Sequence, residues 1–311
     1  MREKVLVITG PTATGKTALG VELALRLGGE VVSADSMQVY RGLDIGTAKV
    51  TAEEARGVPH HLVGVAGPEE DFSVARWVEA AGCTVGDIFA RGKVPVIVGG
   101  TGLYIDSLLS GRDFAMRGDS ALREELGAEY DRIGGDAFRE KLREIDPDRA
   151  EKLLPGDKKR LVRAVEVYLL TGETISAHDA RTRARPPRWD SLRIALSFAG
   201  REALYARIDS RVDAMVRAGL FAEVEALLSG GLSPESTAMQ AIGYKEAARH
   251  LRGEISETEA VETIKRESRR YAKRQLTWLR RDAGAHWILW DGAPDIGRAA
   301  GEVLALWKNM T

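Results

Sequence analysis

The chain has 311 residues, of which 44% are apolar and 29% charged, and its formal net charge is −1. This composition excludes a disordered or collagen-like chain, and the length fits two domains or one large domain with an insertion. A single cysteine excludes an internal disulfide and a multi-cysteine metal site, and the lack of a long apolar run excludes a signal peptide and a membrane span, so we expect a soluble, cytoplasmic protein.

Strand and helix patterns alternate along most of the chain. Short β-branched runs predict strands at Lys4–Thr9, Val31–Ala34, Val94–Val98, Leu192–Phe198 and Trp287–Trp290, with a weaker candidate at His61–Val65. Helical patterns cover Thr17–Leu27, Val74–Ala90, Leu103–Leu109, Ala203–Leu228 and Val261–Arg281. This order predicts an α/β fold with a parallel sheet, helices on both faces and ligands at the carboxyl ends of the strands.

The strand signals stop between about Ala115 and Asp190, where charged helical segments take over. We therefore predict a catalytic core made of residues 1–114 and 190–311, with a helical C-terminal part. Residues 115–189 would form a helical insertion domain.

A phosphate-binding sequence follows the first predicted strand. The motif G-x-x-x-x-G-K-[ST] is met by Gly10, Pro11, Thr12, Ala13, Thr14, Gly15, Lys16 and Thr17. In such a P-loop the backbone N–H groups and the lysine hold phosphate oxygens, and the final hydroxyl binds Mg²⁺. The core is thus P-loop NTPase-like, and this motif alone favours a nucleotide-binding kinase or NTPase.

Two further turns reach the same edge of the predicted sheet. The second strand leads to Asp35, whose carboxylate could hold Mg²⁺ through water, pair with a substrate, accept a proton or simply cap a helix. The third strong strand ends in Gly99-Gly100-Thr101-Gly102, which places the Thr101 hydroxyl near the P-loop.

A set of ordered motifs resembles the bacterial tRNA dimethylallyltransferases. Beside the P-loop these motifs are Ser33–Tyr40 with Asp44–Lys49, Val58–Leu62, Val98–Tyr104, Arg160–Val167, Gln240–Glu246 and Tyr271–Trp278. The resemblance extends from Val5 to about Arg281.

The resemblance implies that the P-loop binds the diphosphate of dimethylallyl diphosphate, with Mg²⁺ at Thr17. Asp35 would accept the proton of the acceptor amine, and Thr101 would lie at the reaction centre. An arginine of the helix Ala203–Leu228 would grip the diphosphate. Arg211 is favoured for this role, and Arg207 stays open as the alternative.

The implied acceptor is N6 of adenosine 37 in a tRNA anticodon stem-loop, extruded from its stack into the protein. The matching tRNA-binding positions are Asp35, Ser36, Met37, Gln38, Thr101, Arg123, Lys159, Arg160, Leu161, Val162, Arg163, Arg270 and Arg274. Basic residues in the insertion and along Val261–Arg281 fit RNA phosphates, although charge runs also form ordinary solvated faces.

Three other functions compete with this interpretation. A small-molecule kinase needs only the P-loop and Asp35, and an adenylate isopentenyltransferase would use a free nucleotide as acceptor. A non-catalytic RNA-binding module would need neither Asp35 nor Thr101. The basic insertion favours whole tRNA, and without a heptad seam we expect a monomer with no obligate protein partner and no membrane contact.

Overall fold

The computed structural model describes residues 3–111, 118–184 and 186–310. They form two compact units, one comprising Met1–Leu109 with Trp189–Thr311 and the other Ser110–Arg188. The predicted boundary at residues 114 and 115 lies outside the described residues.

The larger unit is built on a six-stranded parallel sheet with the strand order β3-β2-β4-β1-β5-β6. The strands are β1 (Lys4–Thr9), β2 (Glu30–Ser33), β3 (His60–His61), β4 (Pro95–Gly99), β5 (Asp190–Phe198) and β6 (His286–Trp290). Central strands such as β2 and β4 are buried along their whole length, as apolar runs in a sheet covered on both faces should be. The α/β prediction is confirmed.

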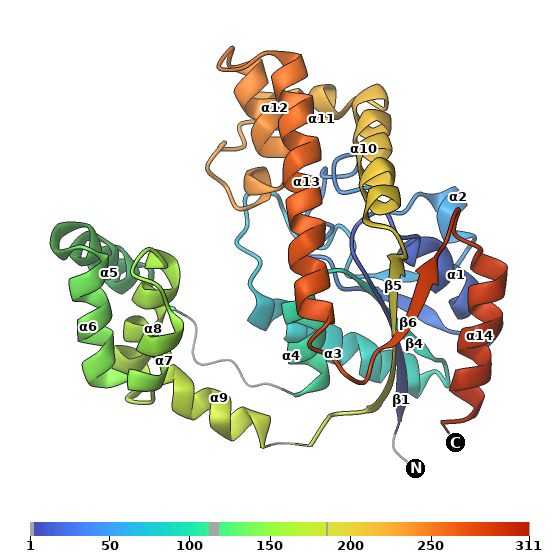
Figure 1. The fold of residues 1–311 in the computed structure, drawn as a ribbon, viewed down its shortest axis with the longest axis horizontal. Helices are drawn as coiled ribbons and strands as arrows, with labels where there is room; N and C mark the ends of the chain where they lie inside the picture. Colours follow the sequence, from blue (N-terminus) through green and yellow to red (C-terminus); the bar gives the residue numbers. More distant parts are fainter. Residues whose placement is uncertain (1–2, 112–117, 185, 311) are drawn as a thin grey trace. The chain divides into compact units, whose positions relative to one another are not determined.

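Helices cover both faces of this sheet (Figure 1). They are α1 (Lys16–Leu27), α2 (Ala52–Ala55), α3 (Val74–Ala90), α4 (Gly102–Leu109), α10 (Arg201–Arg217), α11 (Leu220–Ser229), α12 (Tyr244–Leu251), α13 (Glu257–Leu279), α14 (Ile296–Lys308) and the short 3₁₀ helix η1 (Ala238–Gln240). Helix α1 packs against α14 and α3 against α4, while α10 to α13 pack on one another beyond the carboxyl ends of the strands. These ends are where parallel sheets bind ligands.

Most predicted limits shift by a few residues, and two predicted elements differ more substantially from the structure. The helix expected at Ala203–Leu228 is broken into α10 and α11, because Gly219 adopts a left-handed conformation with φ of 102°. The weak strand expected at His61–Val65 is reduced to His60–His61, because the backbone turns at Leu62, where φ is 61°.

The smaller unit is entirely helical where it is described. Its helices are α5 (Ser120–Ile133), α6 (Gly135–Ile145), α7 (Pro147–Lys152), α8 (Lys158–Thr171) and α9 (Ile175–Arg183). It has an apolar core of its own, to which Phe138, Leu142, Leu161 and Val165 each contribute a side chain with no exposed surface.

None of the helices in the described part of the chain is both long and apolar enough to cross a membrane.

Candidate active site

The P-loop connects β1 to α1, and residues of β5 and β6 hold it in place. Gly10 passes so close to β5 that an added Cβ would lie 2.5 Å from the Leu196 carbonyl oxygen. The Thr14 hydroxyl donates to the Pro11 carbonyl at 2.8 Å, and the buried Trp290 indole N–H donates to the Thr14 carbonyl at 3.0 Å. These contacts fix the shape of the loop, which leads directly into the N-terminus of α1, the end of a helix that favours anions.

Two cationic side chains and one carboxylate lie together beside the P-loop. Lys16 and Arg211 both line the cavity described below, and Asp35 lines it too. Burial, reinforced by the positive charge of Arg211 and opposed by Asp35, lowers the pKa of the Lys16 ammonium to about 7. Burial also lowers the pKa of Arg211, whose Nε has no hydrogen-bond partner among the described residues. This excess of enclosed positive charge suits an anionic ligand.

Asp35 stands at the carboxyl end of β2. Its Oδ1 accepts hydrogen bonds from the backbone N–H groups of Met37, at 2.9 Å, and Gln38, at 3.3 Å. Its Oδ2 accepts no hydrogen bond from the described residues. One oxygen thus fixes the turn and the other remains available to a ligand, so holding the backbone and accepting a proton, two of the four roles weighed from the sequence, are compatible.

The second glycine turn is joined to the end of β2 through Thr101. The Thr101 backbone N–H donates to the Ala34 carbonyl at 3.1 Å, and its Oγ1 accepts the Ser36 N–H at 3.1 Å. The Thr101 hydroxyl also hydrogen-bonds to the Tyr271 phenol, whose pKa is raised to about 12 by burial and by the charge of Asp35. Thr101 therefore links Asp35's turn to α13.

One cavity of about 340 Å³ is lined by Lys16, Asp35 and Arg211, whereas Thr101 lies behind its wall and is not a lining residue. Its polar wall comes from the P-loop, the ends of β2 and β4, and Arg211. Its apolar wall is formed by Val31, Val50, Val63, Ile208, Val212, Met215, Leu220, Ile242 and Ile264. A ligand that carries a diphosphate on a short hydrocarbon chain matches both walls.

Comparison with known proteins assigns the family. The family model described as IPP transferase matches residues 38–282, and one described as isopentenyl transferase matches residues 3–61. A tRNA dimethylallyltransferase of Desulforudis audaxviator is 50% identical over 283 residues, 91% of either chain. The chain belongs to the IPP transferase family.

Solved structures of this family have the same fold. A tRNA isopentenylpyrophosphate transferase from Bacillus halodurans aligns with a TM-score of 0.74 at 41% identity, over 99% of this chain and 96% of the other. A eukaryotic dimethylallyltransferase acting on tRNA aligns with a TM-score of 0.82 at 28% identity, over 99% of this chain and 79% of the other. The IPP transferase fold thus spans both units of the chain.

The two arginines left open by the sequence occupy different places in this IPP transferase. Arg207 donates from Nε to the Ala13 carbonyl at 3.2 Å and lies over the Phe198 ring, so it supports the P-loop from outside the cavity. Arg211, one helical turn further along α10, lines the cavity. This placement favours Arg211 as the side chain that touches the ligand.

The RNA-binding candidates of the smaller unit differ in exposure. Arg123 and Arg163 both bind the buried Glu166 carboxylate, at 3.1 Å and 2.8 Å, and keep 51% and 34% of their side chains exposed. Lys159 and Arg160 are exposed at the start of α8. The predicted positions Leu161 and Val162 are buried in the unit's core, so their side chains do not face solvent.

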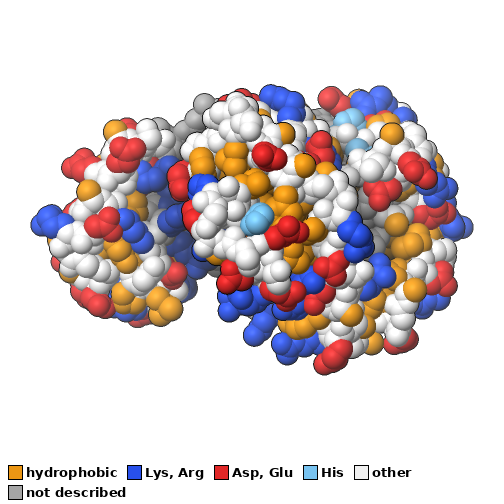
Figure 2. Space-filling view, turned by 90° about the horizontal axis from the view of Figure 1, so that it is seen from above, with side chains coloured by type: hydrophobic (Ala, Val, Ile, Leu, Met, Phe, Trp, Pro, Cys, Tyr) orange, Lys and Arg blue, Asp and Glu red, His pale blue; other side chains and the backbone are white. Residues whose placement is uncertain are grey.

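Candidates on α13 form an exposed basic row. Arg270 binds Glu267 on the same helix at 2.7 Å, and Arg274 lies over the Tyr271 ring and also lines the cavity. The space-filling view shows Lys and Arg side chains gathered at the lower margin of the larger unit (Figure 2). A row of cations that reaches the cavity suits an acceptor carried on a phosphate backbone.

Gln275 lies within the motif Tyr271–Trp278 but is not among the site residues predicted from the sequence. Its Oε1 accepts the Thr12 N–H at 3.1 Å, and its Nε2 donates to the Gly100 carbonyl at 3.0 Å. One buried amide thus joins the P-loop to the second glycine turn. No local pattern signals this, because the partners are 263 and 175 residues away in sequence.

Replacing Gln275 by alanine is expected to weaken diphosphate binding about tenfold and to lower the free energy of unfolding by about 2 kcal/mol, because an enclosed N–H and C=O lose their partners. Calorimetric titration with inorganic diphosphate and Mg²⁺, together with urea unfolding, measures both effects. The control is Thr277→Ala on the same helix, where the exposed hydroxyl bonds only to its own helix. Unchanged diphosphate affinity in the Gln275 variant would contradict the bridging role.

Proposed function

We propose that this protein transfers a dimethylallyl group from dimethylallyl diphosphate to N6 of adenosine 37 in the anticodon loop of tRNA, releasing diphosphate. One observation carries the proposal: a single cavity combines the P-loop, enclosed cations, a carboxylate and an apolar wall. Relatives of this chain that bear the name tRNA dimethylallyltransferase support it.

The P-loop side of the cavity would hold the donor. Its N–H groups, Lys16 and Arg211 would bind the diphosphate, and the apolar wall would hold the five-carbon group. As the allylic C–O bond breaks, negative charge builds on the departing oxygen. Preformed cations and N–H dipoles stabilise that charge where it develops.

Asp35 would serve the acceptor. The exocyclic amine of adenine is a poor nucleophile, because its lone pair is delocalised into the ring. A carboxylate that accepts its proton lets N6 bond to the prenyl carbon as that carbon leaves the diphosphate. The proton ends on Asp35 Oδ2, and the two products are the prenylated base and diphosphate.

Mg²⁺ fits this site as a partner of the diphosphate. Mg²⁺ commonly takes one or two protein ligands and fills its other positions with phosphate oxygens and water. The Thr17 hydroxyl lines the cavity beside Lys16 and would supply one ligand, while the described residues contain no cluster of three acidic, histidine or cysteine side chains. When bound, the ion would neutralise charge on the leaving group.

Each unit carries residues that are proposed to contact the RNA. The proposed contacts are Asp35, Ser36, Met37, Gln38 and Thr101 around the flipped base, and Arg123, Lys159, Arg160, Arg163, Arg270 and Arg274 on the phosphates. Residues 115–189 would thus act as a tRNA-binding insertion.

The deciding experiment incubates the protein and Mg²⁺ with unmodified tRNA and either dimethylallyl diphosphate or ATP, followed by mass spectrometry of the nucleosides. We expect a dimethylallyl mass gain on adenosine only with the prenyl donor, and none when AMP replaces tRNA. Prenylation of AMP would instead identify an adenylate isopentenyltransferase. Phosphate release from ATP without any mass gain would identify a kinase or NTPase.

A further inference from the structure

A single carboxylate from α11 is surrounded by four hydrogen-bond donors. Glu223 Oε2 accepts from the backbone N–H groups of Asp44, at 3.0 Å, and Ile45, at 2.8 Å. Its Oε1 accepts from the Gly46 N–H at 3.2 Å and from the Tyr244 hydroxyl. Successive N–H groups that converge in this way form an anion-binding nest, which here is filled by a side chain from a distant part of the sequence.

The loop held by this carboxylate forms part of the cavity wall. Gly46, Thr47 and Ala48 all line the cavity. At Gly46 an added Cβ would lie 2.4 Å from the Tyr244 ring, so the loop backbone is pressed against α12 at the same point. The hydrogen bonds of Glu223 therefore fix where this wall stands.

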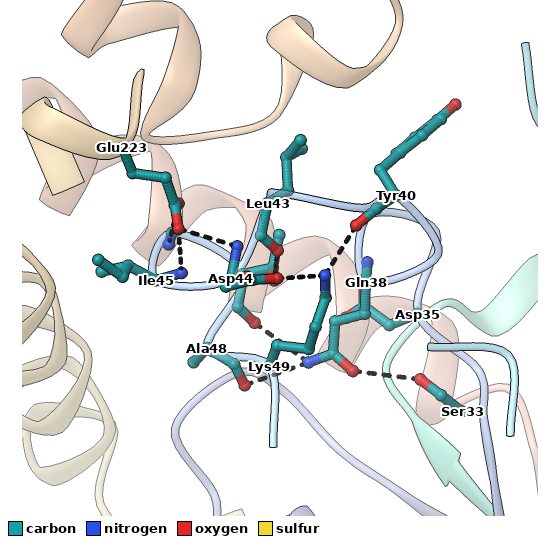
Figure 3. Close-up of polar contacts among 12 residues, drawn as sticks. Ser33, Asp35, Gln38, Tyr40, Leu43, Asp44, Ile45, Ala48, Lys49 and Glu223 are labelled. Carbon is teal, nitrogen blue, oxygen red and sulfur yellow. Dashed lines mark hydrogen bonds and ion pairs between the residues drawn. The ribbon is translucent and has the colours of Figure 1, made fainter. Parts of the chain in front are cut away.

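The opposite side of the loop is connected to Asp35. The Gln38 amide Nε2 donates to the carbonyl of Thr47 at 3.1 Å. It also donates to the carbonyl of Ala48 at 3.3 Å, a contact drawn in Figure 3. The Gln38 Oε1 accepts the Ser33 hydroxyl at 3.2 Å, and its backbone N–H donates to Asp35 Oδ1. The loop of residues 44–48 is thus bonded on one side to Glu223 and on the other to the Gln38 side chain, and the Gln38 backbone is bonded to the Asp35 carboxylate.

The charge of Glu223 is balanced by these dipoles. Within the described part of the chain no lysine or arginine pairs with it, so the three N–H groups and one hydroxyl are its stabilising partners. Burial and the neighbouring carboxylate raise the pKa of the Tyr244 phenol, which keeps this hydroxyl protonated as a donor. Such charge-assisted bonds are stronger than neutral ones and hold a loop accordingly.

We propose that Glu223 is a positioning residue for prenyl transfer: by filling the nest of residues 44–46 it sets the cavity wall and, through Gln38, the orientation of Asp35. The inference rests on the proposed function. Glu223 itself touches no reacting group, so its removal should affect the acceptor side of the reaction and leave the P-loop intact.

The test compares Glu223→Gln with Glu225→Gln, an exposed position on the same helix. The amide has the shape of the carboxylate but turns an NH₂ group towards N–H donors, so we expect kcat for tRNA prenylation to fall about tenfold to a hundredfold. The affinity for inorganic diphosphate with Mg²⁺ should change less than about twofold. Tyr244→Phe, which removes one of the four donors, should lower kcat by less than about tenfold.

Amide hydrogen exchange provides a readout that does not depend on the reaction. Exchange at Asp44, Ile45 and Gly46 should accelerate at least about tenfold in Glu223→Gln and stay unchanged in Glu225→Gln. An unchanged kcat in a folded Glu223→Gln protein would overturn the proposal, as would a parallel loss of diphosphate binding and thermal stability. If the wild-type protein does not prenylate tRNA, the proposed function fails by itself, and the exchange rates then decide whether Glu223 holds the loop.

Discussion

Replacing Asp35 by asparagine is expected to slow prenyl transfer about a hundredfold to ten-thousandfold, the range lost with a general base. Asparagine keeps an Oδ1 that can accept the Met37 and Gln38 N–H groups, so the turn after β2 should survive. What is lost is the second oxygen's capacity to take a proton. Rapid-quench measurement of single-turnover transfer to tRNA isolates this step from product release.

Three comparisons sharpen the Asp35 experiment. Asp35→Ala removes the turn acceptor as well, so it should be no more active than Asp35→Asn and should also be less stable to urea. Asp87→Asn, at an exposed position of α3, should behave as wild type. Inorganic diphosphate should bind Asp35→Asn at least as tightly as wild type, because a negative charge leaves the cavity. Near-normal single-turnover rates in Asp35→Asn would remove Asp35 from the proton-accepting role.

The sheet and the P-loop could be predicted because their signals are local. The strand Lys4–Thr9 has the predicted limits, since a β-branched run next to a glycine turn encodes both the strand and its end. The P-loop is a contiguous motif whose glycines and lysine act through their own backbone. The carboxyl ends of parallel strands lie at one edge of a sheet. Asp35 and Thr101 each follow such a strand, so the sequence alone assigns both residues to that edge.

The break between α10 and α11 shows how a local signal is outweighed. Apolar residues continue at helical spacing through Ala203–Leu228, and this periodicity favours one helix. Gly219 favours a helix end at this point, but because helices often tolerate a glycine, its presence alone does not predict a break. Its left-handed backbone turns the chain, and only then does α11 present Glu223 to the loop at residues 44–46.

Partners that are distant in sequence could not be predicted at all. Gln275 and Glu223 reach backbone groups 175 to 263 residues away, and nothing in the neighbouring sequence of either residue indicates which groups these are. Every residue except proline has a backbone N–H group, so the residue type does not indicate which of these groups bind a distant side chain. The supporting contacts of this cavity are therefore fixed by the tertiary structure, whereas the P-loop, Asp35 and Thr101 belong to local motifs and Arg211 lies between these two cases.

Diphosphate binding is expected to weaken as the pH rises through about 7, because Lys16 loses its proton there. Burial and Arg211 lower the pKa of Lys16 to about 7 in the free protein. A bound diphosphate favours the charged ammonium and raises this pKa, so binding is accompanied by proton uptake once the pH exceeds the free-protein value. Affinity should therefore be retained below about pH 7 and then decline by up to about tenfold per pH unit.

Because inorganic diphosphate titrates as well, the informative quantity is the affinity of the wild type divided by that of Lys16→Met across the same pH range. This ratio should be about tenfold to a hundredfold at about pH 6, the effect of one charged hydrogen bond, and should shrink towards about pH 9. Lys152→Met, on the exposed surface of α7, should give a ratio near one throughout. Titration calorimetry in buffers of different ionisation enthalpy measures the proton uptake directly. A constant wild-type to Lys16→Met ratio from about pH 6 to about pH 9 would mean that Lys16 stays charged in the free protein, and that Asp35 outweighs burial and Arg211.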